Sequence, residues 1–411
     1  MSEITVGAEA VRQRSFHEVW VVSIGHALTH WYPATFYLLL PLIGSELGLS
    51  YGQIGSILAC QFAAGAISNI PGGIFVDAVG RKGLLMALSL FWIGFPYLVM
   101  GFSHVYWMLL VCATLVGIGN NLWHPTAIPY LANRFPDRKG LVMAFHSMGG
   151  NVGDAVAPLV IGALLATYSW RGVVFINVVP GIIMSVMILL YIGRIYNADA
   201  RAGAAESKPP AMTGAERMRS LVTLMKNPAL VTLSVSSAFR AMTQSALLTF
   251  LPVYLARDMG YSAFLIGACL FALQAAGFIA APIAGHLSDT IGRRQIIISS
   301  MSMTAVIILC MAFAGGTIWF VVLIALLGFF LFAVRAVLQA WLLDATPAGM
   351  GGSAIGMLFG TQALGQALGP VTAGIIADHY GIMAAFYFLA ATIILANLTI
   401  FFTPASLIKR P

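Results

Sequence analysis

The sequence predicts an all-α integral membrane protein with twelve transmembrane helices, built from two homologous halves of six. Three observations carry this prediction: the apolar composition, the twelve long apolar stretches, and a repeat that relates the halves. Of the 411 residues, 60% are hydrophobic and only 9% are charged, whereas soluble proteins carry about 25% charged residues. Most of the molecular surface therefore cannot face water.

The apolar stretches have the length and the pattern of membrane helices. A helix needs about 20 apolar residues to cross a hydrocarbon core of about 30 Å. The apolar runs are continuous, which excludes a membrane β-barrel, because barrel strands alternate between apolar and polar residues. Twelve spans are expected at 19–43, 52–76, 83–101, 106–132, 140–166, 171–194, 229–256, 262–286, 293–314, 317–343, 350–377 and 382–403.

The basic residues indicate how the chain is oriented. Seventeen of the 21 Lys and Arg residues lie in the terminal segments and in alternate loops, and only Arg171 and Arg257 lie in the opposite loops. We expect a protein of the cell (inner) membrane. By the positive-inside rule, both of its termini and its central loop are expected on the cytoplasmic side. The polar segment before residue 19 has no apolar run with a cleavage site, so a signal peptide is not expected. The net charge of +7 reports this orientation, and nucleic acid is not expected as a partner.

A repeat divides the chain into two bundles. Residues 1–194 are expected to form the first bundle, 195–227 a cytoplasmic linker loop, and 228–411 the second bundle. Glycines, prolines and charged residues recur at an offset of 212 residues, which points to duplication. The coincident pairs include Gly48 and Gly260, Ser50 and Ser262, Gly55 and Gly267, Asp77 and Asp289, Pro158 and Pro370, and Gly162 and Gly374.

One repeated loop carries a recognisable motif. It reads Gly73-Ile-Phe-Val-Asp77-Ala-Val-Gly80-Arg81-Lys82, and again Gly285-His-Leu-Ser-Asp289-Thr-Ile-Gly292-Arg293-Arg294. The glycines permit a tight reversal, and an Asp beside an Arg can form an ion pair. This loop resembles the cytoplasmic signature of the major facilitator superfamily. The resemblance covers the whole chain and implies two pseudo-symmetric six-helix bundles around a cavity that opens alternately to each side. A role in conformational gating is expected for Gly73, Asp77, Gly80, Arg81, Asp289, Gly292 and Arg293.

A finer resemblance is to the fosmidomycin-resistance type of exporter in that superfamily. It is carried by His124-Pro125, by Gly149-Gly150-Asn151-Val-Gly153 followed by Pro158, by Phe239-Arg240, and by Leu358-Phe359-Gly360. The fifth-span run also approximates the Gly-Pro motif of antiporters. Asp154 and Arg335 stand where that type is not expected to carry charges, so the resemblance does not extend to the substrate.

Polar side chains inside the spans mark candidate pathways, although they also serve as hydrogen-bonding contacts between helices. Four stripes have the spacing of one helical face, on the first, fourth, seventh and tenth spans. These spans line the cavity in the resembled family. Because Arg240 and Arg335 have no acid near them in sequence, an anionic partner is expected. The candidate substrate-binding residues are His26, His30, Tyr37, Asn120, Trp123, His124, Arg240, Gln244, Arg335 and Gln339.

Proton coupling has several candidates. Asp154 is the one carboxylate placed near the middle of the membrane, and desolvation there favours titration near neutral pH. His30 and His146 compete for the role, because imidazole titrates near neutrality without help. A structural acid, bonded to a neighbouring helix or to an arginine, is the alternative reading of Asp154.

These features predict a transporter and not an enzyme. The sequence contains no Gly-x-x-x-x-Gly-Lys-Ser/Thr for ATP, no His-Glu-x-x-His and no Gly-x-Ser-x-Gly, so common nucleotide, metalloprotease and hydrolase sites are not expected. The four cysteines are isolated, and no cofactor or metal is expected. The prediction is a monomeric, proton-coupled antiporter that exports a small anionic or amphiphilic compound. Proton-coupled uptake of an organic anion is the alternative.

Overall fold

The computed structural model describes residues 16–120, 122–201, 222–314, 318–347 and 350–403. These residues form helices joined by short connections, and no strand occurs among them. The first half contains α1 (His17–Glu46), α2 (Tyr51–Val79), α3 (Lys82–Met100), α4 (Tyr106–Asn120), α5 (Trp123–Arg134), α6 (Lys139–Leu164) and α7 (Trp170–Arg201). The second half contains α9 (Pro228–Arg257), α10 (Ala263–Thr290), α11 (Arg293–Ala314), α12 (Ile318–Asp344), α13 (Gly351–Tyr380) and α14 (Ile382–Phe401).

Every expected span coincides with a helix, with two differences. The fourth span is covered by two helices, α4 and α5, and residue 121 between them lies outside the described residues. The sixth span ends near residue 194 as expected, because the candidate membrane span is Trp170–Ile195, but the helix itself, α7, continues to Arg201. Of the rest of the expected linker, residues 202–221 lie outside the described residues, as do residues 1–15 and 404–411, while residues 222–227 are described and lead into α9.

The outer surface of the described helices suits a lipid environment. Seven of the spans are long and apolar enough to cross a membrane by length and composition alone. Large apolar side chains such as Trp107 and Phe313 are 71% and 83% exposed. A soluble monomer rarely exposes such side chains in large contiguous patches. The surface therefore fits acyl chains rather than water.

The turns confirm the local signals of the repeat. Gly48 and Gly260 have φ of 61° and 65°, a left-handed conformation that favours glycine. Just after them, the hydroxyls of Ser50 and Ser262 accept hydrogen bonds from the first turns of α2 and α10. Both halves therefore start their second helix with the same glycine turn and serine N-cap.

The motif loops also reverse as expected. Gly80 ends α2 with φ of 69°, and Gly292 precedes α11 with φ of 115°. In the second half, Arg293 pairs with Asp289 at 2.6 Å and with Asp344 of α12 at 3.2 Å. The predicted Asp–Arg ion pair is thus present in that half. The side chain of Asp77 lies outside the described residues.

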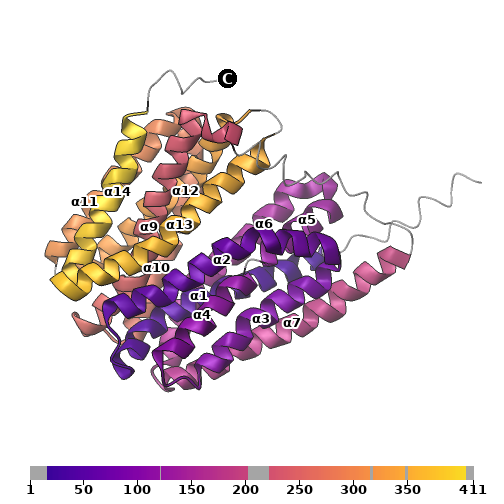
Figure 1. Cartoon of the computed structure of the whole chain (residues 1–411), viewed down its shortest axis with the longest axis horizontal. Helices are drawn as coiled ribbons and strands as arrows, with labels where there is room; N and C mark the ends of the chain where they lie inside the picture. The colour runs from indigo at the N-terminus through magenta and orange to yellow at the C-terminus, as the bar shows by residue number, and fades with distance from the viewer. Residues whose placement is uncertain (1–15, 121, 202–221, 315–317, 348–349, 404–411) are drawn as a thin grey trace, which may run out of the picture.

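The two halves meet through one contact that occurs twice. In Figure 1 the indigo-to-magenta and orange-to-yellow bundles pack together at one end and separate toward the other. At the closed end α2 packs against α13, and α6 packs against α10. A Cβ placed on Gly55 would lie 2.1 Å from the Pro370 carbonyl oxygen, and one on Gly267 would lie 2.2 Å from that of Pro158. These two contacts are related by the repeat, and both need the missing side chain of glycine.

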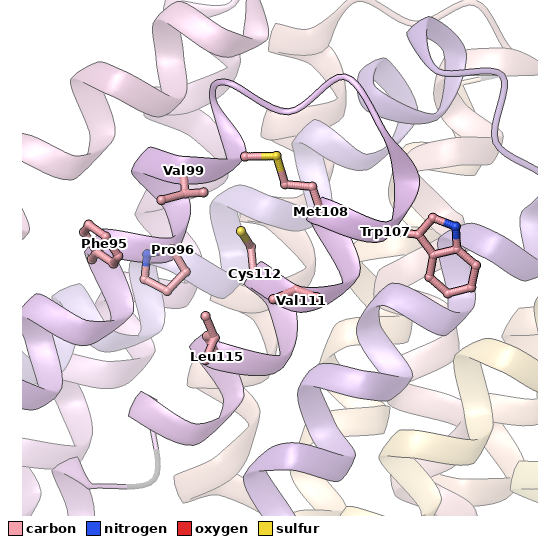
Figure 2. A pocket seen from close by; sticks show the side chains of 8 residues that line it. All are labelled: Phe95, Pro96, Val99, Trp107, Met108, Val111, Cys112 and Leu115. Carbon is pink, nitrogen blue, oxygen red and sulfur yellow. The ribbon is translucent and has the colours of Figure 1, made fainter.

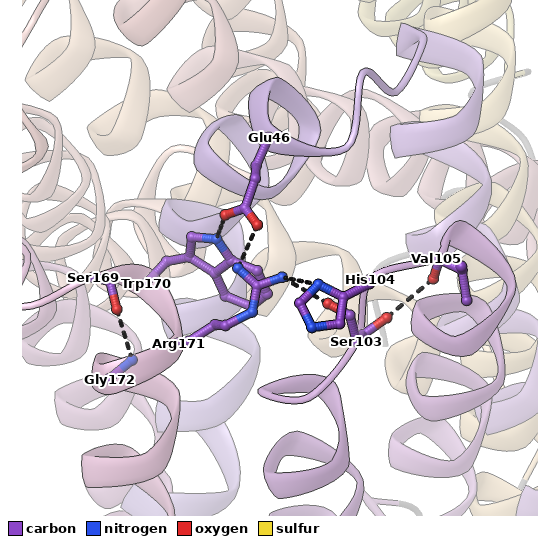
Figure 3. Close-up of polar contacts among 8 residues, drawn as sticks. All are labelled: Glu46, Ser103, His104, Val105, Ser169, Trp170, Arg171 and Gly172. Atoms are coloured by element: carbon purple, nitrogen blue, oxygen red, sulfur yellow. Dashed lines mark hydrogen bonds and ion pairs between the residues drawn. The ribbon is translucent and has the colours of Figure 1, made fainter.

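A polar cluster fixes the same end of the first half (Figure 3). The Glu46 carboxylate at the end of α1 accepts a hydrogen bond from the Trp170 indole at 2.5 Å and pairs with Arg171 of α7. Arg171 also donates to the Ser103 carbonyl at 2.7 Å. These contacts join α1, α7 and the connection between α3 and α4, all within one half.

Candidate functional site

Glycines on α6 bring the candidate residues of the first half together. A Cβ on Gly149 would lie 2.2 Å from the Ser23 carbonyl oxygen of α1, and one on Gly153 would lie 2.1 Å from that of Ala27. A Cβ on Gly150 would lie 2.8 Å from an atom of the His26 ring. The glycine-rich motif therefore lets α6 approach the α1 backbone, and it leaves room for the imidazoles of α1.

Four histidines cluster at this contact. His26 is 4% exposed and His146 is 3% exposed, and their rings stack at 3.9 Å between centroids. His26 donates from Nδ1 to the backbone carbonyl of His146 at 2.6 Å, and its Nε2 lies 3.2 Å from Nε2 of His124 on α5. His30 packs edge-on against His26 at 4.7 Å. Three helices thus contribute imidazoles to one cluster.

Asp154 lies at the edge of this cluster. Its Oδ2 accepts a hydrogen bond from His30 Nδ1 at 2.9 Å, and both side chains are about 30% exposed. The Asp154 charge also interacts with Tyr37 on α1. The alternative reading of Asp154 is a structural acid bonded to a neighbouring helix or to an arginine. Its hydrogen-bonding partner is His30 of the neighbouring helix α1, and no arginine pairs with it among the described residues.

Arg240 is a buried cation on α9. Its side chain is 2% exposed, and Nη1 donates to Gln244 Oε1 at 2.8 Å, as their spacing of four residues predicts. Its Nε is buried with no hydrogen-bond partner. In the described part of the chain, no carboxylate lies within 4 Å of this guanidinium.

Arg335 on α12 links the two halves electrostatically. Its charge interacts with Asp154 and His124 of the first half and with Arg240 of its own half. Its side chain is exposed and, among the described residues, forms no ion pair within 4 Å. Stripes from α1, α5, α9 and α12 therefore converge on one region, with a carboxylate on one side and two guanidiniums on the other.

Three of the expected residues are less directly connected to this region. Trp123 is fully buried against Gly25 of α1, and its ring lies parallel to His26 at 6.4 Å. Hydrogen bonds among the described residues connect neither Asn120 nor Gln339 to the cluster, and Asn120 Oδ1 is buried without a partner. In this conformation Trp123 supports the histidines by packing.

A separate apolar pocket lies between α3 and α4 (Figure 2). Its volume is about 400 Å³, and every residue that lines it is apolar or a cysteine. Three of its lining residues, Phe95, Trp107 and Val111, are between 49% and 71% exposed. It contains none of the candidate charged residues, so we assign it to the lipid-facing surface rather than to the functional site.

Comparison with known proteins identifies the family. The model of the Major Facilitator Superfamily matches residues 22–278 and 233–411. The chain is 28% identical over 393 residues to the fosmidomycin resistance protein of Escherichia coli (strain K12), covering 94% of this chain and 93% of that protein. It is 27% identical over 368 residues to the multidrug resistance protein MdtG of Yersinia enterocolitica, covering 87% and 86%.

A solved structure supports the fold. The inward-facing, unoccupied structure of a bacterial homologue of the human lysosomal transporter Spinster superposes with a TM-score of 0.78, covering 95% of this chain and 97% of that one at 16% identity. The twelve predicted helices, the repeated motif loop and these matches describe a multi-pass membrane transporter and not an enzyme. The chain belongs to the Major Facilitator Superfamily.

Proposed function

We propose that this chain is a proton-coupled antiporter of the inner membrane that exports a small anionic or amphiphilic compound by alternating access. The observation that carries the proposal is that Arg335, which forms no ion pair within 4 Å among the described residues, interacts electrostatically with the Asp154 carboxylate of the other half. The relatives named for fosmidomycin and multidrug resistance favour export.

The substrate charge is inferred from Arg240 and Arg335. An arginine inside a membrane is costly unless a partner neutralises it. Asp154 is the acid that interacts with Arg335, yet it is bonded to His30. One guanidinium at least is therefore left to bind an anionic group, and its planar fork suits a carboxylate, phosphonate or phosphate.

The proton is assigned to the Asp154 carboxylate. It lies on α6, the helix that contacts both α1 of its own half and α10 of the other half, and its charge interacts with Arg335. Protonation of Asp154 neutralises its carboxylate and so removes its electrostatic interaction with Arg335 across the interface between the two halves. An anion and a deprotonated Asp154 compete for the same arginine, so binding of an anion favours protonation of Asp154. This linkage moves a proton and an anion in the same direction and supports the alternative, proton-coupled uptake of an organic anion, whereas export is supported by the names of the relatives.

The conformation supports alternating access. If the motif loops are cytoplasmic, as the basic residues predict, the end where α2 meets α13 faces outward. The helices separate toward the opposite end (Figure 1), so the structure corresponds to an inward-facing state. An exporter in this state is ready to take its substrate from the cytoplasm.

The test uses the purified protein in liposomes. A thermal-shift screen of organic anions first identifies a ligand, because a compound that binds the folded state raises its apparent stability. With that ligand, Asp154→Asn is expected to abolish transport driven by a pH gradient while retaining exchange of labelled for unlabelled substrate. The exposed Asp258→Asn serves as the control. Gradient-driven transport that survives in Asp154→Asn refutes the proton assignment, and accumulation driven inward by an inward proton gradient identifies uptake instead.

A further inference from the structure

We propose that His26, His124 and His146 form a binding site for a divalent transition metal ion of the zinc class, with one coordination position left open. The three side chains come from α1, α5 and α6. Each offers a ring nitrogen, and these atoms all lie within 4.8 Å of one another.

The spacing of two of the nitrogens already fits a metal. Tetrahedral zinc binds histidine nitrogens at about 2.0–2.1 Å, which places two of them about 3.3 Å apart. The Nε2 atoms of His26 and His124 are 3.2 Å apart. All the ligand atoms lie within 4.8 Å of one another. To complete the set, the ring of His146, which is now stacked parallel on His26 at 3.9 Å, has to rotate so that one of its lone pairs points at the same metal ion.

The hydrogen bond that His26 donates from Nδ1 leaves its Nε2 able to bind a metal ion. A carbonyl oxygen can only accept, so His26 must donate from Nδ1 to the His146 carbonyl at 2.6 Å. In the neutral ring this leaves a lone pair on Nε2, which points at His124. Histidines that bind metals show this same arrangement, with the second ring nitrogen held by a carbonyl or a carboxylate.

His146 provides an independent indication of a missing partner. Its side chain is 3% exposed, and both ring nitrogens are buried with no hydrogen-bond partner in the described part of the chain. Buried polar groups without partners are rare and call for an explanation such as a bound ion. A metal at this position satisfies one of these nitrogens and the lone pair of His26 together.

The surrounding charge constrains the fourth ligand. Arg335 interacts with His124 and opposes a cation, whereas the Asp154 carboxylate is held by His30 nearby. A three-histidine site keeps an open position for water or another oxygen donor, and an anionic donor there offsets the positive charge. The metal is expected to bind in the substrate-free protein, so its binding is measured separately from transport.

The experiment is a titration of tag-free purified protein in detergent with Co²⁺, a spectroscopic substitute for zinc. We expect one Co²⁺ per chain, with the visible absorption of a tetrahedral complex, and displacement by Zn²⁺. His146→Ala and His124→Ala are each expected to weaken binding by at least about ten-fold, since losing even an outer-shell partner costs about that much. His379→Ala, an exposed histidine at the end of α13, is the matched control.

The outcomes separate the site from its alternatives. Because His124 is exposed, its replacement is expected to leave the thermal unfolding of the protein unchanged, which keeps the test valid if His146→Ala fails to fold. Absence of stoichiometric Co²⁺ binding overturns the proposal and leaves the histidines as a hydrogen-bonded chain. Binding that is lost in His379→Ala and retained in His124→Ala also overturns it. Neither result bears on the proton and anion assignments, which are tested by transport.

Discussion

Asp378 on α13 forms a latch between the two halves, and its removal is expected to shift the conformational equilibrium. Its carboxylate accepts hydrogen bonds from the backbone N–H groups of Tyr51 and Gly52 at 2.8 Å, and from the Ser50 hydroxyl at 2.9 Å. All three donors belong to the N-terminus of α2, in the other half. The bonds exist only while the halves are closed at this end.

The magnitude follows from the contacts. Losing a side chain that caps a helix N-terminus costs about 0.5–2 kcal/mol, and a negative charge at that terminus contributes about 0.3–1 kcal/mol more. Because these bonds are exposed, we take about 1–3 kcal/mol for Asp378→Ala. A coupling of that size corresponds to about a 5–150-fold change in an equilibrium. The change favours the state that is open at the α2–α13 end.

The assay measures the distance between spin labels on exposed positions of the two halves. Thr167→Cys and Asp258→Cys provide such a pair, after Cys60 and Cys310, the two native cysteines that are not buried, have been replaced. In Asp378→Ala the long-distance population is expected to grow at the expense of the short one. Asp378→Asn should lie between, because its amide oxygen still accepts one bond.

A matched control uses a carboxylate at the same end. Glu46 bonds to Trp170 and Arg171, both in its own half (Figure 3). Glu46→Ala should therefore lower the stability of the first bundle and leave the ratio of the two label distances unchanged. An unchanged distance distribution in Asp378→Ala, or an equal shift in Glu46→Ala, would refute the latch.

Three further predictions follow from contacts in the structure. Arg335→Ala should weaken binding of the anionic ligand by about ten- to a hundred-fold, because a hydrogen bond to a charged group contributes about 1.5–3 kcal/mol. A calorimetric titration measures the affinity, and Arg335→Lys should restore only part of it. Full affinity in Arg335→Ala would contradict the assignment. Gly55→Ala should disfavour the closed α2–α13 contact, since its Cβ would lie 2.1 Å from the Pro370 carbonyl oxygen; the same spin-label pair would report it, and an unchanged population would show that the helices adjust. Asp289→Asn should remove the 2.6 Å ion pair with Arg293 and slow transport. Ligand affinity should stay within about two-fold of the unmodified protein, as expected for a contact distant from the ligand. A loss of equilibrium binding would contradict a gating role.

The sequence alone determined the fold class, the helices and the repeat. Membrane spans are readable because each must be long and apolar over its whole length, and the glycine turns at Gly48 and Gly260 are local features with a fixed chemistry. The repeat also related Gly55 to Gly267 and Pro158 to Pro370. It did not reveal that Gly55 packs on Pro370 and Gly267 on Pro158, because that contact crosses between the halves.

The tertiary structure decided which candidate residues act together. Spacing along a helix predicts only neighbours on that helix, so it paired Arg240 with Gln244 correctly and could not pair His30 with Asp154. The histidine cluster was missed for the same reason, since His26, His124 and His146 belong to three helices and share no motif. The latch at Asp378 gives no sequence signal, because its donors are backbone N–H groups more than 300 residues away. Partners across helices are chosen by how closely the backbones approach, and only the packed bundle fixes those distances.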